Sequence, residues 1–298
     1  MRERESQVAL GLDPDPAQLL PEAVAGESAP SGRPAEQAAR AVASHCRLLI
    51  EAAGPACAAV KLQLACFERL GAPGWDALAD VAGVARAAGL LVIADGKRGD
   101  VPHTAAAYAQ ALLGTTPTPW GEVSGLGADA VTLNPLLGRD SLEPLVAAAR
   151  ERGSGCFVLV RTSNPGAAEI QDEAGPSTPP LRERLAGLVA ALGTDGVGEC
   201  GLADVGAVVA ATEPELLAGL RDAMPRAIFL LPGVGAQGGR AELLAPAFAP
   251  GRAAALIAAS RSIAGPALQA GSAAESRTAA RGAAEALREA AWEVSAPD

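Results

Sequence analysis

Eight short apolar runs, each followed by a helical pattern, constrain the fold of this chain more than any other feature. The runs are rich in Val, Ile, Leu and Ala and lie near residues 8, 58, 91, 131, 157, 207, 229 and 255. Such runs are typical of strands buried on both faces of a parallel sheet. Eight strand–helix alternations on about 250 residues predict an α/β fold, a (β/α)8 TIM barrel. We therefore expect residues 1–298 to form a single barrel domain.

Three stretches fall outside the alternation. Residues 15–33 are rich in Pro, Ser and Gly and are expected to form an arm or excursion. Residues 115–127 hold two Pro, three Gly and a Trp, which predicts an insertion loop. Residues 275–298 are expected to form a C-terminal helix and tail. Helices between the strands are predicted at 35–53, 75–88, 104–113, 141–150, 180–191 and 213–223.

The composition excludes several classes of function. With 298 residues, 49% of them hydrophobic, the chain can bury a large core. Its 34 acidic and 24 basic residues give a net charge of -10, which argues against nucleic acid as the main partner. No run of 18 apolar residues is present, so we expect no membrane span. The first residues, MRERESQ, lack the apolar core of a signal peptide, and a cytoplasmic protein is expected.

Cysteine and histidine are too few and too scattered for a metal or disulfide framework. The five cysteines are odd in number and form no CxxC pair, and the histidines are His45 and His103. We therefore predict reduced thiols and no metal site. His45 lies on an Ala-rich helical pattern and is expected to be structural. His103 follows a charged motif, and a role in a site stays open for it.

That charged motif is the strongest local signal of chemistry. Asp95, Lys97, Arg98 and Asp100 directly follow the apolar run 90–93. In an extended segment Asp95 and Lys97 project to the same side, where each would keep the other charged. A solvated turn after a strand is the alternative. Parallel α/β folds place their chemistry at these strand ends, which favours a catalytic site.

Polar residues follow the other strands as well. The Asp13 carboxylate is suited either to accepting hydrogen bonds from sugar hydroxyls or to capping a turn. The Lys61 ammonium is suited either to a functional site or to an exposed position at the surface. The segment 162–166, TSNPG, suits either the edge of a planar heterocycle or an ordinary turn. Because all these residues follow strands, they should face one cavity. The candidates for substrate binding at these strand ends are Asp13, Asn134, Ser163, Gly235, Gln237 and Arg261.

The last two strand ends predict a phosphate site. The glycine-rich loop 232–239, PGVGAQGG, allows backbone N–H groups to approach an anion closely and allows the loop to move as a lid. Arg261, in the Ser-Arg-Ser that follows the next strand, is suited to a bidentate contact with phosphate. These positions correspond to the usual phosphate site of a (β/α)8 barrel.

Taken together, the motifs resemble those of the orotidine 5′-phosphate decarboxylase family, in its bacterial branch with longer insertions. The resemblance covers nearly the whole chain. It rests on six motifs: LGLDP at 10–14, VKLQLACFE at 60–68, DGKRGD at 95–100, RTSNPG at 161–166, PGVGAQGG at 232–239 and SRSI at 260–263.

The resemblance implies a cofactor-independent decarboxylase that acts on orotidine 5′-phosphate in de novo pyrimidine biosynthesis and forms a homodimer. Lys61, Asp95, Lys97 and Asp100 would form the family's charged tetrad, with Lys97 protonating C6 of the pyrimidine. Asp100 and Thr104 would reach into the partner subunit's site. By the same resemblance, Asp13 would bind the ribose, Ser163 the pyrimidine, and Gln237 with Arg261 the phosphate.

Three departures from the family's usual pattern leave its charges intact. Gly96 stands where Ala is usual, Leu62 where Pro is usual, and 101–103, VPH, where Ile-Gly-Ser is usual. They bear on loop shape and rate more than on the type of reaction. Two alternatives stay open: a sugar-phosphate decarboxylase or aldolase of the same superfold, and a catalytically silent nucleotide-binding protein.

Overall fold

Eight parallel strands close into a barrel in the computed structural model, which describes residues 1–25 and 32–295. Neighbouring strands in the chain are neighbours in the barrel, in the order β1-β10-β9-β8-β7-β6-β3-β2. The barrel strands are β1 Val8–Leu12, β2 Ala59–Gln63, β3 Leu91–Arg98, β6 Ala130–Leu133, β7 Gly155–Arg161, β8 Val205–Val209, β9 Phe229–Pro232 and β10 Ala255–Ala259. The predicted (β/α)8 barrel is confirmed, because each of the eight predicted runs contains a barrel strand.

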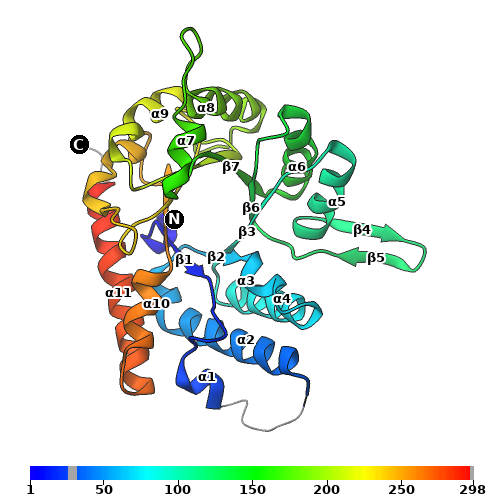
Figure 1. Cartoon of the computed structure of the whole chain (residues 1–298), viewed down its shortest axis with the longest axis vertical. Helices are drawn as coiled ribbons and strands as arrows, with labels where there is room; N and C mark the ends of the chain where they lie inside the picture. Colours follow the sequence, from blue (N-terminus) through cyan, green and yellow to red (C-terminus); the bar gives the residue numbers. More distant parts are fainter. Residues whose placement is uncertain (26–31, 296–298) are drawn as a thin grey trace.

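Helices surround the barrel, as Figure 1 shows. The helices of four or more residues are α1 Pro21–Ala25, α2 Pro34–Ala53, α3 Leu64–Glu68, α4 Ala72–Ala87, α5 Pro102–Leu112, α6 Arg139–Arg152, α7 Ala168–Gln171, α8 Leu181–Leu192, α9 Leu217–Ala223, α10 Arg261–Leu268 and α11 Ala273–Val294. Local sequence explains several of their ends. Proline occupies the first turn of α2 and of α5, where its missing N–H costs nothing. Helix α11 begins after Ser272, whose hydroxyl accepts a hydrogen bond from the Glu275 N–H.

Apolar side chains pack in two layers. The larger layer lies between the strands and the helices and includes Leu10, Val60, Val92 and Phe229. A smaller cluster, which includes Ile93, Phe157, Val208, Leu230 and Ala258, holds side chains of alternate strand positions. In a strand, alternate side chains point to opposite faces, so one set meets the helices and the other fills the barrel.

Strand β3 is irregular where it carries the charged motif. Its pairing with β6 runs through Ala94 opposite Val131, and then shifts to place Arg98 opposite Leu133. The bulge therefore falls on residues 95–97. Lys97 lies within it at a φ of 47°, in the left-handed region that a lysine rarely adopts.

The stretches outside the alternation take three forms. The stretch 115–127, expected to be a loop, contains an antiparallel hairpin, β4 Thr115–Thr118 and β5 Gly121–Ser124, which projects from the barrel (Figure 1). The stretch 15–33 contains α1, and its residues 26–31 lie outside the described part of the chain. Helix α11 occupies most of 275–298, of which 296–298 also lie outside the description. No helix in the described ranges is long and apolar enough to cross a lipid bilayer.

Candidate active site

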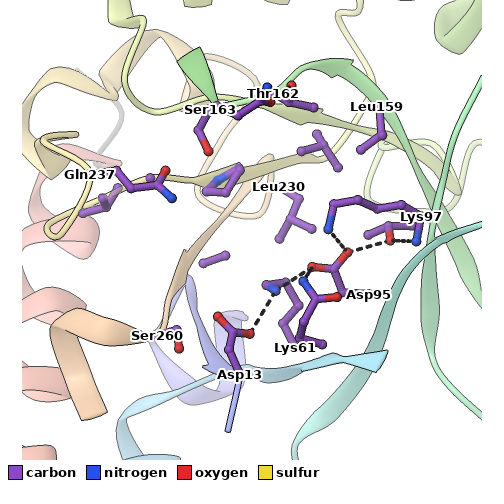
Figure 2. Close-up of a pocket in the computed structure, with 18 of the residues that line it drawn as sticks. Asp13, Lys61, Asp95, Lys97, Leu159, Thr162, Ser163, Leu230, Gln237 and Ser260 are labelled. Atoms are coloured by element: carbon purple, nitrogen blue, oxygen red, sulfur yellow. Dashed lines mark hydrogen bonds and ion pairs between the residues drawn. The ribbon is translucent and has the colours of Figure 1, made fainter. Parts of the chain in front are cut away.

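A cavity of about 480 Å³ opens where the barrel strands end. Its wall includes side chains from β2, β3, β6, β7, β8, β9 and β10 and from the loops that follow them. Seven residues that the sequence singled out line it, namely Asp13, Lys61, Asp95, Lys97, Ser163, Gln237 and Arg261. Figure 2 shows the charged group on one side of the cavity and Ser163 with Gln237 across from it.

The carboxylate of Asp95 is the centre of the charged group. Lys61 Nζ donates to Oδ2 at 2.6 Å, and Gln63 Nε2 donates to the same oxygen at 3.3 Å. Lys97 Nζ and the Thr132 hydroxyl donate to Oδ1, at 2.7 and 2.8 Å. Each carboxylate oxygen thus accepts two hydrogen bonds, which satisfies the lone pairs of an ionised carboxylate.

Charge keeps Asp95 and Lys61 ionised although both are buried. Burial alone would raise the pKa of Asp95, but the Lys61 and Lys97 ammoniums outweigh it and hold that pKa at about 2. Burial opposes the charge of Lys61 too, and its pKa is nonetheless raised by the carboxylates of Asp95 and Asp13. Asp13 Oδ1 lies 3.7 Å from Lys61 Nζ. At neutral pH the site therefore holds a fixed row of alternating charges.

The two lysines differ in their access to a ligand. The side chain of Lys61 is 10% exposed, whereas that of Lys97 is 41% exposed and lines the open cavity. Leu159 and Leu230 line the same cavity as Lys97 (Figure 2). Lys97 is therefore the ammonium that a bound molecule can contact directly.

A polar loop after β7 forms the opposite wall. The Gln171 side chain accepts a hydrogen bond from the Thr162 N–H at 2.8 Å and donates to the Thr162 hydroxyl at 3.0 Å. Just before this loop, the buried guanidinium of Arg161 contacts both carboxylate oxygens of Asp172 at 3.0 Å. These contacts join residues 161–162, just before Ser163, to residues 171–172, and the Ser163 side chain faces the cavity.

The third side of the cavity suits an anion. Arg261 is the first residue of α10 and is exposed at the cavity wall, next to Ser260. The loop after β9 carries Gln237 and reverses through Gly233, Gly235 and Gly238, each at a positive φ. Glycine adopts this backbone at little cost, so the loop can bring N–H groups close to a ligand.

Four residues that the sequence singled out do not line the cavity of their own chain. Asn134 Oδ1 accepts a hydrogen bond from the Leu136 N–H at 3.1 Å, which is the turn chemistry expected of an Asn-Pro pair. Gly235 lies against Ser262, where an added Cβ would stand 2.8 Å from the serine Cβ. Asp100 accepts from the Val101 N–H, and Thr104 is exposed on α5. His45 is also away from the cavity. It is buried, and its Nδ1 accepts a hydrogen bond from the Leu20 N–H.

Three polar side chains of the cavity were missed, those of Gln63, Thr132 and Gln171. Gln63 follows Lys61 by two positions, so strand alternation could have placed it on the same face. Thr132 interrupts the apolar run 130–133, which was a weak signal. Gln171 lies on a short helix after a turn and carried no signal. Within 1–25 and 32–295, no group of three or more His, Cys, Asp or Glu could hold a metal ion.

Comparison with known proteins agrees with this geometry. A family model described as orotidine 5′-phosphate decarboxylase / HUMPS family matches residues 6–276. An orotidine 5′-phosphate decarboxylase from Deinococcus radiodurans is 48% identical over 216 residues, 72% of this chain and 74% of its own length. One from Rhodopirellula baltica is 42% identical over 261 residues, 87% of this chain and 83% of its own length.

Solved structures match over nearly the whole chain. The OMP decarboxylase of Leishmania donovani aligns with a TM-score of 0.71 at 29% identity, covering 97% of this chain and 96% of its own. The UMP synthase of the same organism aligns with a TM-score of 0.72 at 31% identity, and this chain spans 54% of its length. On the family match and the identity to these relatives, the chain belongs to the orotidine 5′-phosphate decarboxylase / HUMPS family.

Proposed function

We propose that this chain decarboxylates orotidine 5′-phosphate to UMP and CO2, as a cofactor-independent step of de novo pyrimidine biosynthesis. The observation that carries the proposal is the Lys61–Asp95–Lys97 row, held in one cavity of a chain that belongs to this family. Three of the relatives described above, from Deinococcus radiodurans, Rhodopirellula baltica and Leishmania donovani, are named as decarboxylases of this nucleotide. The cavity provides room for a nucleotide, and the row provides charges beside the carbon that loses CO2.

The cavity offers a place for each part of the nucleotide. Arg261 and Gln237 would hold the phosphate, and Asp13 would accept hydrogen bonds from the ribose. Ser163, on the polar loop, would hydrogen-bond the pyrimidine. With the phosphate and base held in this way, the carboxylate at C6 would lie beside Asp95 and Lys97. Binding energy from the phosphate is remote from the reacting carbon and can offset the cost of placing two anions together.

The reaction itself needs little more than placed charge. The C6–CO2 bond breaks and leaves its electron pair on C6, in the ring plane where no π system accepts it. Asp95 disfavours the substrate carboxylate, while the Lys97 ammonium stabilises the forming carbanion and then donates a proton to C6. Lys61, which is buried on the side of Asp95 away from the substrate, keeps Asp95 ionised through its positive charge.

We propose further that the active form is a cytoplasmic homodimer. Asp100 and Thr104 follow Lys97 closely in the sequence, but they do not line the cavity that contains Lys97. This placement suits residues that act in a neighbouring subunit. Asp100 of one subunit would complete the charge row of the other, and Thr104 would contact the partner's nucleotide.

Replacing Lys97 tests the proposal. We expect Lys97→Ala to lower kcat by at least about 10⁴-fold, because it removes both the proton donor and the cation beside C6. Turnover is measured from the fall in ultraviolet absorbance of orotidine 5′-phosphate. Affinity for UMP, measured by calorimetry, should stay detectable because the phosphate contacts remain.

The same assay separates the alternatives. Release of CO2 that is unaffected by EDTA argues against a Mg²⁺-dependent sugar-phosphate enzyme. Binding of UMP by the unaltered protein without any turnover would make it a silent nucleotide-binding protein. Near-normal turnover by Lys97→Ala would refute the assigned role of that lysine.

A further inference from the structure

Thr132 connects the two central charged residues of the site. This threonine is buried in the middle of β6, with 1% of its surface exposed. Its hydroxyl donates to Asp95 Oδ1 at 2.8 Å and accepts the backbone N–H of Lys97 at 2.9 Å. One side chain thus holds the carboxylate of Asp95 and the main chain of Lys97 at once.

The β-bulge explains why a hydroxyl is needed there. Because the register of β3 against β6 shifts between Ala94 and Arg98, regular ladder pairing is interrupted over the residues between them. The Lys97 N–H, at the end of the bulge, is accepted by the Thr132 hydroxyl. This hydrogen bond is partly buried, and an N–H shielded from water without an acceptor is costly, so the contact compensates for the interrupted ladder.

The conformation of Lys97 depends on the same contact. In the described chain only Lys97 and Glu5 have a positive φ without being glycine, and Lys97 has a φ of 47°. A lysine keeps such a backbone only where its surroundings hold it. Relaxation toward an ordinary φ would turn the Lys97 side chain to another direction. Its Nζ would then leave Asp95 Oδ1, which it now contacts at 2.7 Å.

We propose that Thr132 is a positioning residue that holds Lys97 in its left-handed backbone and aims its ammonium at the reacting carbon. The inference rests on the proposed function, in which Lys97 is the proton donor. Thr132 acts through Asp95 and Lys97, so its loss affects the chemical step more than nucleotide binding. Misplacement of a catalytic group by about 1 Å can cost about 100-fold in rate.

Two substitutions separate the hydroxyl from the rest of the side chain. Thr132→Val keeps the shape and the strand preference of threonine but removes the hydroxyl, and Thr132→Ser restores the hydroxyl. We expect Thr132→Val to lower kcat by about 10- to 100-fold with little change in KM, and Thr132→Ser to keep most of the activity. Thr132→Ala provides a second variant without the hydroxyl if the valine variant does not fold.

A matched control removes a buried hydroxyl elsewhere. The Ser141 hydroxyl is buried at the start of α6 and donates to the Gly138 carbonyl at 2.6 Å, away from the cavity. We expect Ser141→Ala to lower the melting temperature while kcat stays unchanged. Melting temperatures of all variants show whether a loss of kcat follows from unfolding.

The outcomes distinguish this inference from the proposed function. If the unaltered protein turns over orotidine 5′-phosphate and both hydroxyl-free variants keep kcat within about threefold, Thr132 does not position Lys97. A rise in KM at unchanged kcat would overturn the inference equally, because it would place Thr132 in nucleotide binding. Absence of turnover in the unaltered protein would refute the proposed function instead.

Discussion

At the scale of single residues, His45 links the stability of the fold to pH. It is buried beneath α1, where its Nδ1 accepts the Leu20 N–H at 3.1 Å. Burial lowers the pKa of His45 from 6.5 to about 4. The unfolded chain therefore binds a proton between these two values that the folded chain does not, and stability falls as the pH falls through this window.

We expect this residue to cost the protein about 2 kcal/mol of unfolding free energy between pH 7 and pH 5. Urea unfolding at the two pH values measures the loss. In His45→Asn, whose amide oxygen can take the place of Nδ1 but does not titrate, the loss should be smaller by that amount. His103→Gln is the control, since it removes the exposed histidine and leaves His45 in place. An equal pH dependence in His45→Asn and the unaltered protein would contradict the prediction.

Residue type and spacing predicted the charged residues of the site but not the polar residues that hold them in place. Asp95 and Lys97 were predictable because charges at alternate positions after an apolar run share one face. Thr132 was not, since threonine is ordinary in strands and its role arises only because it lies against the bulge and accepts the Lys97 N–H. The pairing of Gln171 with Thr162 likewise depends on how a loop folds back, which no local pattern encodes.

At the scale of elements, the loop that follows β9 depends on glycine at particular positions. Gly235 has a φ of 78° and lies against Ser262, where a Cβ would come within 2.8 Å. Gly238 has a φ of 91° but has open space around its Cα. The two positions share the backbone requirement and differ in the room for a methyl group.

This difference predicts unequal effects of alanine. Both substitutions strain the backbone at a cost of about 1 kcal/mol or more, but only Gly235→Ala also displaces Ser262 and the start of α10. We expect Gly235→Ala to raise KM for orotidine 5′-phosphate by about 10-fold, because the loop carries Gln237 toward the proposed phosphate site. Gly238→Ala, the matched control, should raise KM less. Steady-state kinetics of the two variants measures the difference. An equal rise in KM in both variants would show that the contact with Ser262 is unimportant.

Strands and helices with a clear period were predictable, and the hairpin β4–β5 was not. Its strands are short and partly or fully exposed, and β4 contains Pro117, so no alternation of apolar and polar residues marks them. Hydrogen bonds between the two strands, rather than side-chain burial, define this element. Trp120 lies between the strands and is 93% exposed.

At the scale of the whole molecule, the barrel was predictable because closure needs only eight parallel strands in chain order. The assembly of chains is a proposal, and a mixing experiment tests it. Neither Lys97→Ala nor Asp100→Ala should be active alone. If Asp100 acts in the partner's site, a hybrid dimer of the two variants contains one complete site.

Mixing the two inactive variants in equal amounts, after reversible dissociation, should therefore restore roughly one quarter of the unaltered activity. Half of the dimers are then hybrid, and half of the sites in each hybrid are complete. Absorbance assays across a range of mixing ratios check this expectation. Absence of any recovery, with hybrids present by native mass spectrometry, would place Asp100 outside the partner's site.

The four donors around Asp95 have a consequence for each catalytic cycle. A carboxylate whose acceptors are all occupied, and whose pKa is about 2, is already ionised before the nucleotide arrives. In the proposed reaction, the repulsion that Asp95 would exert on the substrate carboxylate is set when the chain folds and is present at every turnover. In the proposed reaction one proton then enters the product, and solvent must return it to Lys97 before the next substrate reacts.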